Sequence, residues 1–412
     1  MRSPRAAVWG WLALVSLAAL WGTTLLDEAK LFAPPLFGRF DIRLSIRLVA
    51  PLIVGVVTIA FAPRIARSIG WRAVLAATFL LSAVWIVSLA AASGPADIAR
   101  PLDAATEQLA AVGRADSPLN FLRGFTSSIE ELPLHVQGHP PGGVLLLHAA
   151  SAMGVNGPGP LAVVIVLAAA TAPLAVLLAA RDVAGEQFAR RAAPFLAVAP
   201  AAVWIGTSMD ALFMAVAAWA VALIIVAGSR VVLAIAGGAL FGAALFLSYG
   251  IAPVALIPAA VTAARKRWRL LILAGGGAAL VVAAFAAAGF WWLDGLAATV
   301  ERYRAGVSSA RPYTYFVVAN LAAFALALGP AAAGGLARLR PKRAWLICGP
   351  ALVAVLLADL SGLSKGEVER IWLPFLPWVL VAAGAHMSHD RRWLAAQVVC
   401  ALAIQIGVAT PW

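Results

Sequence analysis

Apolar runs long enough to cross a lipid bilayer recur along the whole of this 412-residue chain. A bilayer-spanning helix needs about 20 predominantly apolar residues. Hydrophobic residues make up 63% of the chain and charged residues only 12%, which is about half the charged fraction of an ordinary soluble domain. Because the runs are spread over the full length, the sequence predicts a polytopic membrane protein rather than a soluble domain with one anchor.

The same runs predict an all-α fold, formed by one integral membrane domain over residues 1–412 with about 13 spanning helices. Their expected positions are 6–26, 45–62, 73–93, 159–180, 190–207, 209–228, 231–248, 250–264, 270–292, 313–337, 344–361, 371–386 and 393–410. We expect the first run to be retained as a span, because it is long for a signal peptide and no clear cleavage site follows it.

Basic residues cluster between the predicted spans. The clusters are Arg64, Arg67 and Arg72; Arg181, Arg190 and Arg191; Arg265, Lys266, Arg267 and Arg269; Arg338, Arg340, Lys342 and Arg343; and Arg391 and Arg392. Cytoplasmic loops collect Lys and Arg, so we expect these loops and the N-terminus in the cytoplasm. Basic loops account for the net charge of +13 without a nucleic-acid partner. The Ala-rich, Lys-poor composition suggests a bacterial protein, and therefore the plasma membrane.

A short apolar run at 143–155 determines the predicted topology. With about 13 residues it is short for a span and suits a re-entrant or interfacial helix. If it crossed the membrane, the basic clusters at 265–269 and 338–343 would face outward, against the positive-inside rule. We therefore place 94–158 entirely on the outer side, as a loop with amphipathic juxtamembrane helices and one short apolar helix.

Acidic residues gather on this predicted outer side. Of the 18 Asp and Glu residues, only Asp182, Glu186 and Asp390 fall on the inner side. Orientation rules do not require this bias, since acidic residues contribute little to topology. The outer face is therefore where we expect the acidic chemistry, in the segments 27–44, 94–142, 293–312 and 361–371.

The longest polar segment, 94–142, ends in His135-Val136-Gln137-Gly138-His139-Pro140-Pro141-Gly142. Long loops in compact proteins are usually functional or disordered, and the apolar residues that recur here favour short helices on the membrane surface. The paired prolines fix the chain at the entry of the short apolar helix. They are expected to hold His139 near the bilayer surface.

The motif His139-Pro140-Pro141-Gly142 followed by an apolar helix resembles a signature of polyprenyl-phosphate-sugar-dependent glycosyltransferases of the GT-C fold. The basic loop 180–192, the outer turn Ser208-Met209-Asp210-Ala211-Leu212 and the stretch from Lys365 to Phe375 resemble further features of that family, in the same order. The likeness covers roughly residues 95–385. The Gly-His-Pro-Pro-Gly form is similar to an actinobacterial branch that decorates cell-envelope lipoglycans and includes the methylthioxylose transferase.

This resemblance implies a GT-C-like helix bundle that transfers a sugar with inversion from a polyprenyl-phosphate donor to a glycan or lipoglycan acceptor on the outer face. The family uses an outer-loop carboxylate as general base, typically from an Asp-Glu pair ahead of the His-Pro-Pro motif. The corresponding stretch here is Leu102-Asp103-Ala104-Ala105-Thr106-Glu107-Gln108-Leu109, which has no such pair. Glu107 is the first candidate for the base and Asp103 the second.

The resemblance also implies cations that stabilise the departing phosphate, a task that suits Arg and Lys. We assign Arg370 and Lys365 to the phosphate, and His139, His135, Glu367 and Asp210 to substrate binding. Each has a simpler alternative: Glu107 and Asp103 on a solvated helix face, Arg370 as a snorkelling arginine paired with Glu367 or Glu369, and Asp210 as a helix cap.

The sequence predicts no metal and no cofactor, because His, Cys, Asp and Glu do not recur with metal-ligand spacing and a phosphate-cradling Gly-rich loop is absent. Gly275-Gly276-Gly277 lies inside a predicted span and indicates close helix packing. Cys348 and Cys400 lie in apolar runs and predict no disulfide.

Two other function classes stay open. A secondary transporter or flippase of a lipid-linked or small polar substrate would need an intramembrane carboxylate for proton coupling, and Asp359 and Asp210 are the candidates. The second class is a non-catalytic subunit that assists assembly or flips lipid. Loss of sugar transfer on substitution of Glu107 and Arg370 would separate the transferase from both.

Overall fold

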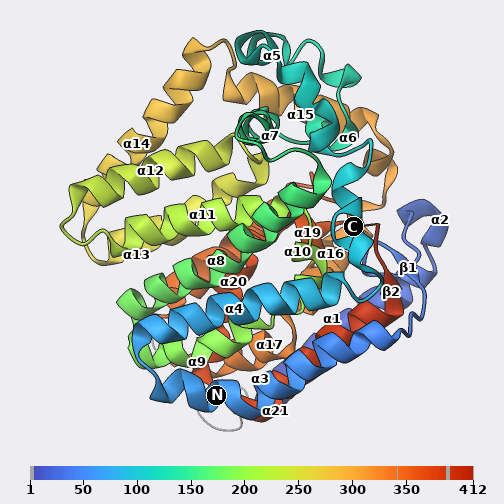
Figure 1. Cartoon of the computed structure of the whole chain (residues 1–412), viewed down its shortest axis with the longest axis vertical. Helices are drawn as coiled ribbons and strands as arrows, with labels where there is room; N and C mark the ends of the chain where they lie inside the picture. The colour runs from blue at the N-terminus through green and yellow to red at the C-terminus, as the bar shows by residue number, and fades with distance from the viewer. Residues whose placement is uncertain (1–3, 341, 387–389, 412) are drawn as a thin grey trace.

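The computed structural model describes residues 4–340, 342–386 and 390–411, and it is almost entirely helical (Figure 1). Its α-helices are α1 (Pro4–Thr23), α2 (Leu26–Ala29), α3 (Val49–Ser68), α4 (Trp71–Ala90), α5 (Pro118–Gly124), α6 (Leu134–Gln137), α7 (Gly142–Ala152), α8 (Pro158–Ala184), α9 (Glu186–Ala197), α10 (Ala202–Ile205), α11 (Met209–Val226), α12 (Val231–Leu245), α13 (Leu256–Ala264), α14 (Trp268–Ala287), α15 (Trp292–Ala305), α16 (Tyr313–Leu328), α17 (Pro330–Arg338), α18 (Trp345–Leu360), α19 (Val368–Ile371), α20 (Leu376–Leu380) and α21 (Asp390–Gly407).

Short 3₁₀ helices and one small sheet complete the fold. The 3₁₀ helices are η1 (Ile46–Leu48), η2 (Pro95–Ile98), η3 (Arg100–Asp103), η4 (Gln108–Ala115), η5 (Ile129–Glu131), η6 (Tyr249–Ala255), η7 (Val307–Ala310) and η8 (Val381–Ala385). Strands β1 (Arg39–Phe40) and β2 (Val408–Ala409) pair antiparallel, with Arg39 opposite Ala409. The sheet therefore ties the first polar loop to the C-terminal end of the chain (Figure 1).

Six of the described helices are long and apolar enough to cross a bilayer, namely Arg5–Thr23, Ile46–Ser68, Trp71–Ala90, Pro158–Ala184, Met209–Val226 and Trp268–Ala287. A seventh candidate is the bent pair α16 and α17. Large apolar side chains on α1, α3 and α14 are exposed, among them Leu20, Val56 and Ile272. Water would disfavour so much exposed apolar surface, so these faces suit contact with lipid.

Two of the expected continuous spans are broken in the structure. The run 313–337 folds as α16 and α17, which meet at an angle of 91°. Gly329 at the break has a φ of 78°, a left-handed conformation that glycine tolerates, and Pro330 then begins α17. The run 190–207 is likewise divided, into α9 and α10. The run 371–386 forms a shorter helix over Leu376–Ala385, in which η8 continues α20 directly. Hydropathy does not detect these breaks, because the residues on both sides of each are apolar.

Helices α8 and α11 form the centre of the bundle, with α4, α9 and α12 packed around them (Figure 1). Nearly every side chain of α11 is buried, and most of them are Ala, Val, Ile or Met. Small side chains let helix backbones approach closely, which is the main source of packing energy between helices in lipid. The Ala-rich composition is therefore what allows a tightly packed core in this chain.

Two glycines mark the closest approach of α12 and α14. A Cβ atom on Gly238 would lie 1.9 Å from the carbonyl oxygen of Ala274, and one on Gly277 would lie 2.3 Å from that of Ile235. The predicted role of Gly275-Gly276-Gly277 in helix packing is confirmed only for Gly277, since a Cβ on Gly275 or Gly276 would meet nothing within 4 Å.

Replacing Gly277 by Ala is expected to destabilise the protein by about 1–3 kcal/mol, because the added methyl group would force α12 and α14 apart. The same replacement at Gly275 is the matched control, and there Ala should be neutral or stabilise the helix by up to about 1 kcal/mol. Thermal unfolding of the two variants in the same detergent measures the difference. Equal unfolding temperatures would contradict the close contact.

The basic loops lie together at one end of the bundle. Arg190 donates to the carbonyl oxygens of Ala66 and Ile69, at 2.8 and 2.7 Å, and Arg67 pairs with Asp390 at 2.7 Å. Arg265 pairs with Asp182. The aromatic residues Trp71, Trp268 and Trp345 are the first residues of α4, α14 and α18, which all begin at this end. Tryptophan at this position is typical of a membrane–water interface.

The four segments expected on the outer side also contact one another. The Phe37 N–H donates to Glu369 at 2.8 Å, Arg302 pairs with Glu130 at 2.7 Å, and Arg311 donates to the Lys365 carbonyl at 2.6 Å. The segment 94–142 is a series of short helices, as predicted, and α7 has only 11 residues. Polar segments far apart in the sequence thus meet in one region.

Candidate functional site

The turn between α6 and α7 fixes both predicted histidines. His135 lies in α6, and its backbone N–H donates to the Thr106 carbonyl at 2.9 Å. His139 Nδ1 lies 2.6 Å from the His135 carbonyl oxygen, the distance of a hydrogen bond, so the two side chains are held in a fixed relation. A Cβ on Gly142 would lie 2.3 Å from the Phe246 carbonyl oxygen, so only glycine allows α7 to begin this close to its neighbour.

Glu107 lies directly against His135. His135 Nδ1 and Glu107 Oε1 are 2.7 Å apart, and the side chains are 16% and 11% exposed. The alternative in which Glu107 lies on a solvated helix face is therefore wrong. A carboxylate that accepts a hydrogen bond from an imidazole orients the ring, so this pair provides two adjacent proton-accepting groups.

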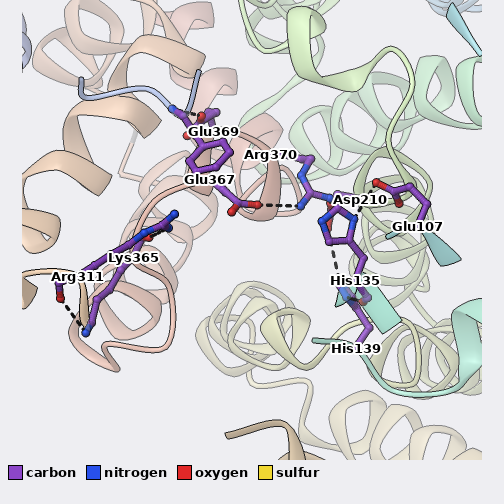
Figure 2. A network of polar contacts seen from close by, with 10 residues as sticks. Glu107, His135, His139, Asp210, Arg311, Lys365, Glu367, Glu369 and Arg370 are labelled. Atoms are coloured by element: carbon purple, nitrogen blue, oxygen red, sulfur yellow. Dashed lines mark hydrogen bonds and ion pairs between the residues drawn. The ribbon is translucent and has the colours of Figure 1, made fainter. Parts of the chain in front are cut away.

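Asp210 and Arg370 form a buried ion pair across 160 positions of sequence. Arg370 Nη1 donates to Asp210 Oδ2 at 2.6 Å, and the two side chains are only 5% and 3% exposed. His139 Nε2 lies 3.8 Å from the other oxygen of Asp210 (Figure 2). The snorkelling alternative is wrong because Arg370 is buried, although the pairing with Glu367 that went with it is confirmed. The Asp210 carboxylate binds Arg370 and does not cap α11.

Glu367 is the third carboxylate of this network. Its Oε2 accepts from Arg370 Nη2 at 3.2 Å. Its φ is 63°, a left-handed conformation that is uncommon outside glycine, and it directly follows Gly366, whose φ is 91°. Burial alone would lower the pKa of Arg370, but Asp210, Glu367 and Glu107 raise it, so the guanidinium stays charged.

Lys365 lies apart from Arg370, on the far side of Glu367 (Figure 2). Its ammonium group donates to the carbonyl oxygens of Ser309 and Arg311, at 2.7 and 3.0 Å. Arg311 in turn donates from Nη1 to the Lys365 carbonyl. The two cations predicted to bind phosphate together, Arg370 and Lys365, are thus in different environments, one between carboxylates and the other among carbonyl groups.

Asp103 does not join the network. It is exposed, at the last position of η3, and within the described residues it makes none of the contacts that link Glu107 to Arg370. Of the eight predicted site residues, Glu107, His135, His139, Asp210, Glu367 and Arg370 are brought together and Asp103 and Lys365 are not.

Three carboxylates and two histidines around one arginine give the site more acceptors than cations. Such a set can accept a proton from a hydroxyl and can hold a polar substrate by hydrogen bonds. Within the parts of the chain that the structure describes, three or more His, Cys, Asp or Glu side chains do not come together as they would around a metal ion.

Two buried polar residues near the site were not singled out in the sequence. Glu369 is 1% exposed, and its Oε1 accepts from the Phe37 backbone rather than from Arg370. Asn320 in α16 donates to Asp359 at 3.0 Å and to the Ser364 carbonyl at 2.7 Å, and accepts from Gly366 N–H. A lone Asn in an otherwise apolar span was the available signal for Asn320.

Burial raises the pKa of Glu369 to about 7, from an ordinary value of 4.5. Between these values the folded protein holds a proton that the unfolded chain has released. Stability is therefore expected to fall, by roughly 3 kcal/mol in total, as the pH rises from about 4.5 to 7, and to level off above it.

Thermal unfolding from pH 5 to 8 tests this expectation. Glu369→Gln should remove the pH dependence of the unfolding temperature over this range. Its stability relative to the wild type should therefore increase as the pH rises. Glu130→Gln, at a carboxylate that is 73% exposed, is the matched control and should keep the wild-type slope. A parallel pH dependence for wild type and Glu369→Gln would show that Glu369 titrates normally.

Comparison with known proteins leaves the chain without an assigned relative: no family model, no curated protein and no solved structure matches it.

Proposed function

We propose that this protein is a membrane glycosyltransferase of GT-C type, which moves a sugar from a polyprenyl-phosphate donor to a cell-envelope glycan or lipoglycan. The observation that carries the proposal is the meeting of Glu107, His135, His139, Asp210 and Arg370 in one network. These residues come from separate segments that the sequence assigns to one side of the membrane. A hydrophilic site at the ends of apolar helices suits a lipid-linked substrate.

In this proposal the chain crosses the plasma membrane of a bacterium about 13 times, with its N-terminus in the cytoplasm and the site on the outer face. The contacts among the basic loops at the opposite end support this arrangement. The broken helices α9–α10 and α16–α17 would each serve as one irregular span, buried in the bundle where neighbouring helices satisfy the exposed backbone groups.

Glu107 is the proposed general base. It takes the proton of the acceptor hydroxyl while the hydroxyl oxygen attacks the anomeric carbon, and the bond from that carbon to the lipid phosphate oxygen breaks with its electron pair on the phosphate. His135 holds the Glu107 carboxylate in position by their hydrogen bond. His139 lies against the His135 carbonyl and near Asp210, and in this proposal His139 and Asp210 bind substrate hydroxyls.

The charge of Arg370 is already balanced by Asp210 and Glu367, so in this proposal Arg370 shapes the site. Lys365 lies apart from the Glu107 network, and its ammonium group donates to the carbonyl oxygens of Ser309 and Arg311, so in this proposal it stabilises the loop before Glu367.

One observation favours the transporter or flippase alternative. The sharp break between α16 and α17 lies in an apolar segment, and transporters form substrate sites at such interrupted helices. Asn320 and Asp359 form a buried polar pair on α16 and α18 that could take part in proton coupling.

The purified protein in lipid nanodiscs, with labelled polyprenyl-phosphate sugars and a lipoglycan acceptor, tests the proposal. We expect labelled glycan with an inverted anomeric centre, detectable by NMR. Proteoliposomes loaded with the same donors measure movement of the donor across the bilayer, which tests the alternative. Movement of donor across the bilayer without any transfer would reject the transferase and support the alternative.

A further inference from the structure

A cavity of about 450 Å³ lies at the end of the bundle where the basic loops gather. Its lining residues are Arg181, Asp182, Val183, Ala184, Gly185, Lys342 and Arg343. The first five end α8 and the last two directly precede α18, so two loops that are far apart in the sequence enclose one space. A cavity of this volume is within the range of small-molecule sites.

Gly185 keeps this space open at the turn between α8 and α9. It is the one residue between the two helices, and its φ is 95°, a left-handed conformation that glycine tolerates. A Cβ atom on Gly185 would meet nothing within 4 Å, so the turn is not packed against a neighbouring element. Val183 and Ala184 supply the apolar part of the lining.

Positive charge exceeds negative charge around the cavity. Among the described residues that line it, Arg181, Lys342 and Arg343 are cations and Asp182 is the single acid. The Asp182 carboxylate already pairs with Arg265, whose Nη2 also donates to the Asp182 carbonyl at 2.8 Å. Asp182 is therefore occupied by a cation from outside the cavity and does not neutralise the three inside it.

The next acid along the chain, Glu186, is shared between two arginines. Its Oε2 lies 2.7 Å from Arg181 Nη2 and its Oε1 lies 2.7 Å from Arg190 Nη2. Lys342 and Arg343 are exposed, and neither forms an ion pair with any residue that the structure describes. Because these two like charges are adjacent and line the same cavity, an anion inside it would be attracted by both.

Two tryptophans indicate that the cavity lies at the depth of lipid headgroups. The Arg181 guanidinium is 4.8 Å from the centre of the Trp71 ring, and Trp71 begins the apolar helix α4. Trp345, two positions after Arg343, begins the apolar helix α18. Tryptophan is enriched at the membrane–water interface, where the phosphates of phospholipids lie. Basic pockets between helices at this depth bind anionic headgroups.

We propose that this cavity binds the phosphate headgroup of an anionic phospholipid, with Arg181, Lys342 and Arg343 as its cations. The planar guanidinium groups match the oxygens of a phosphate, and the ammonium group adds a point charge. The inference rests on the placement of the apolar helices in a membrane and is independent of sugar transfer. The proposed orientation of the chain makes this leaflet the cytoplasmic one.

Binding of phosphatidylglycerol to the full-length protein tests the site without an activity assay. The lipid is titrated into the protein in detergent, and native mass spectrometry measures the fraction bound. The double variant Lys342→Gln with Arg343→Gln is expected to weaken binding about 30-fold, which is roughly fivefold for each cation lost. Phosphatidylcholine, whose headgroup has no net charge, should bind equally weakly to the wild type and the variant.

Lys266→Gln with Arg267→Gln is the matched control. Lys266 and Arg267 are likewise an exposed Lys-Arg pair just before a tryptophan that begins a helix, but they are not among the residues that line the cavity. This variant loses the same charge from the same end of the bundle and should keep its affinity for phosphatidylglycerol within about twofold. Equal losses in the two double variants would mean that overall charge attracts the lipid, and would overturn the site.

Two measurements on the wild type complete the test. A photoreactive phosphatidylglycerol should label residues 181–185 or 342–343, and labelling confined to other segments would overturn the site even if a variant failed to fold. Inorganic phosphate at the concentration of the lipid should not displace it. Displacement by phosphate as effective as that by unlabelled phosphatidylglycerol would reject a lipid as the ligand.

Discussion

Replacing Glu107 by Gln is expected to lower sugar transfer by about 10²- to 10⁴-fold, the range that a general base contributes. The amide keeps the size of the side chain and can still hydrogen-bond to His135, but it cannot take the proton of the acceptor hydroxyl. We therefore expect the loss in kcat, with little change in the apparent affinity for the donor. Initial rates in nanodiscs, measured over a range of donor and acceptor concentrations, separate the effect on kcat from the effect on the apparent affinity.

Asp103→Asn is the matched control for Glu107→Gln. Asp103 lies in the same loop, four positions earlier, but is exposed and outside the network. Its replacement should leave the rate within about twofold of the wild type, as for a surface substitution of small energetic effect. If Asp103→Asn abolished transfer and Glu107→Gln did not, the second candidate for the base would be the correct one. Full activity in both variants would reject a base in this loop.

Replacing Asp210 by Ala is expected to destabilise the protein by about 3–5 kcal/mol, because it leaves the charge of Arg370 buried without its closest partner. Both side chains are almost fully buried, so water cannot take the place of the carboxylate. The consequence should be a large fall in the unfolding temperature, measured in detergent, together with loss of any activity that depends on the site.

The double variant Asp210→Leu with Arg370→Met separates the structural effect from the functional one. Replacing both members of a buried ion pair by apolar residues of similar size is often neutral or stabilising. We expect its unfolding temperature to return close to the wild-type value while transfer stays lost. An Asp210→Ala variant as stable as the wild type would contradict the buried pair, and an active double variant would remove both residues from the site.

Several residues that the sequence predicted for the site lie together in the structure. The pair of prolines after His139 indicated a fixed turn, and the structure has His139 hydrogen-bonded at the start of α7. The acidic outer turn identified Asp210, and the cluster of charges before Trp372 identified Glu367 and Arg370. Such signals are visible in one sequence because polar residues are rare among apolar runs.

Other parts could not be read from the sequence. Glu107 and Asp103 are both acidic and lie four positions apart in one polar loop, and the contact with His135 is what places Glu107 in the network. Glu369 and Arg370 are neighbours in the chain, yet one binds the Phe37 backbone and the other Asp210. In the sequence, Arg311 is one of several basic residues in the segment 293–312. Only the structure shows that its side chain is buried.

The sequence alone determined that this chain is a bundle of apolar helices with its basic loops gathered apart from its acidic ones, because hydropathy and charge act locally on each segment. Only the tertiary structure decided which helices are broken and which carboxylate meets which cation. The reason is physical: the Asp210–Arg370 contact joins residues 160 positions apart, and its geometry depends on how α11 and α19 pack rather than on the residues beside either one.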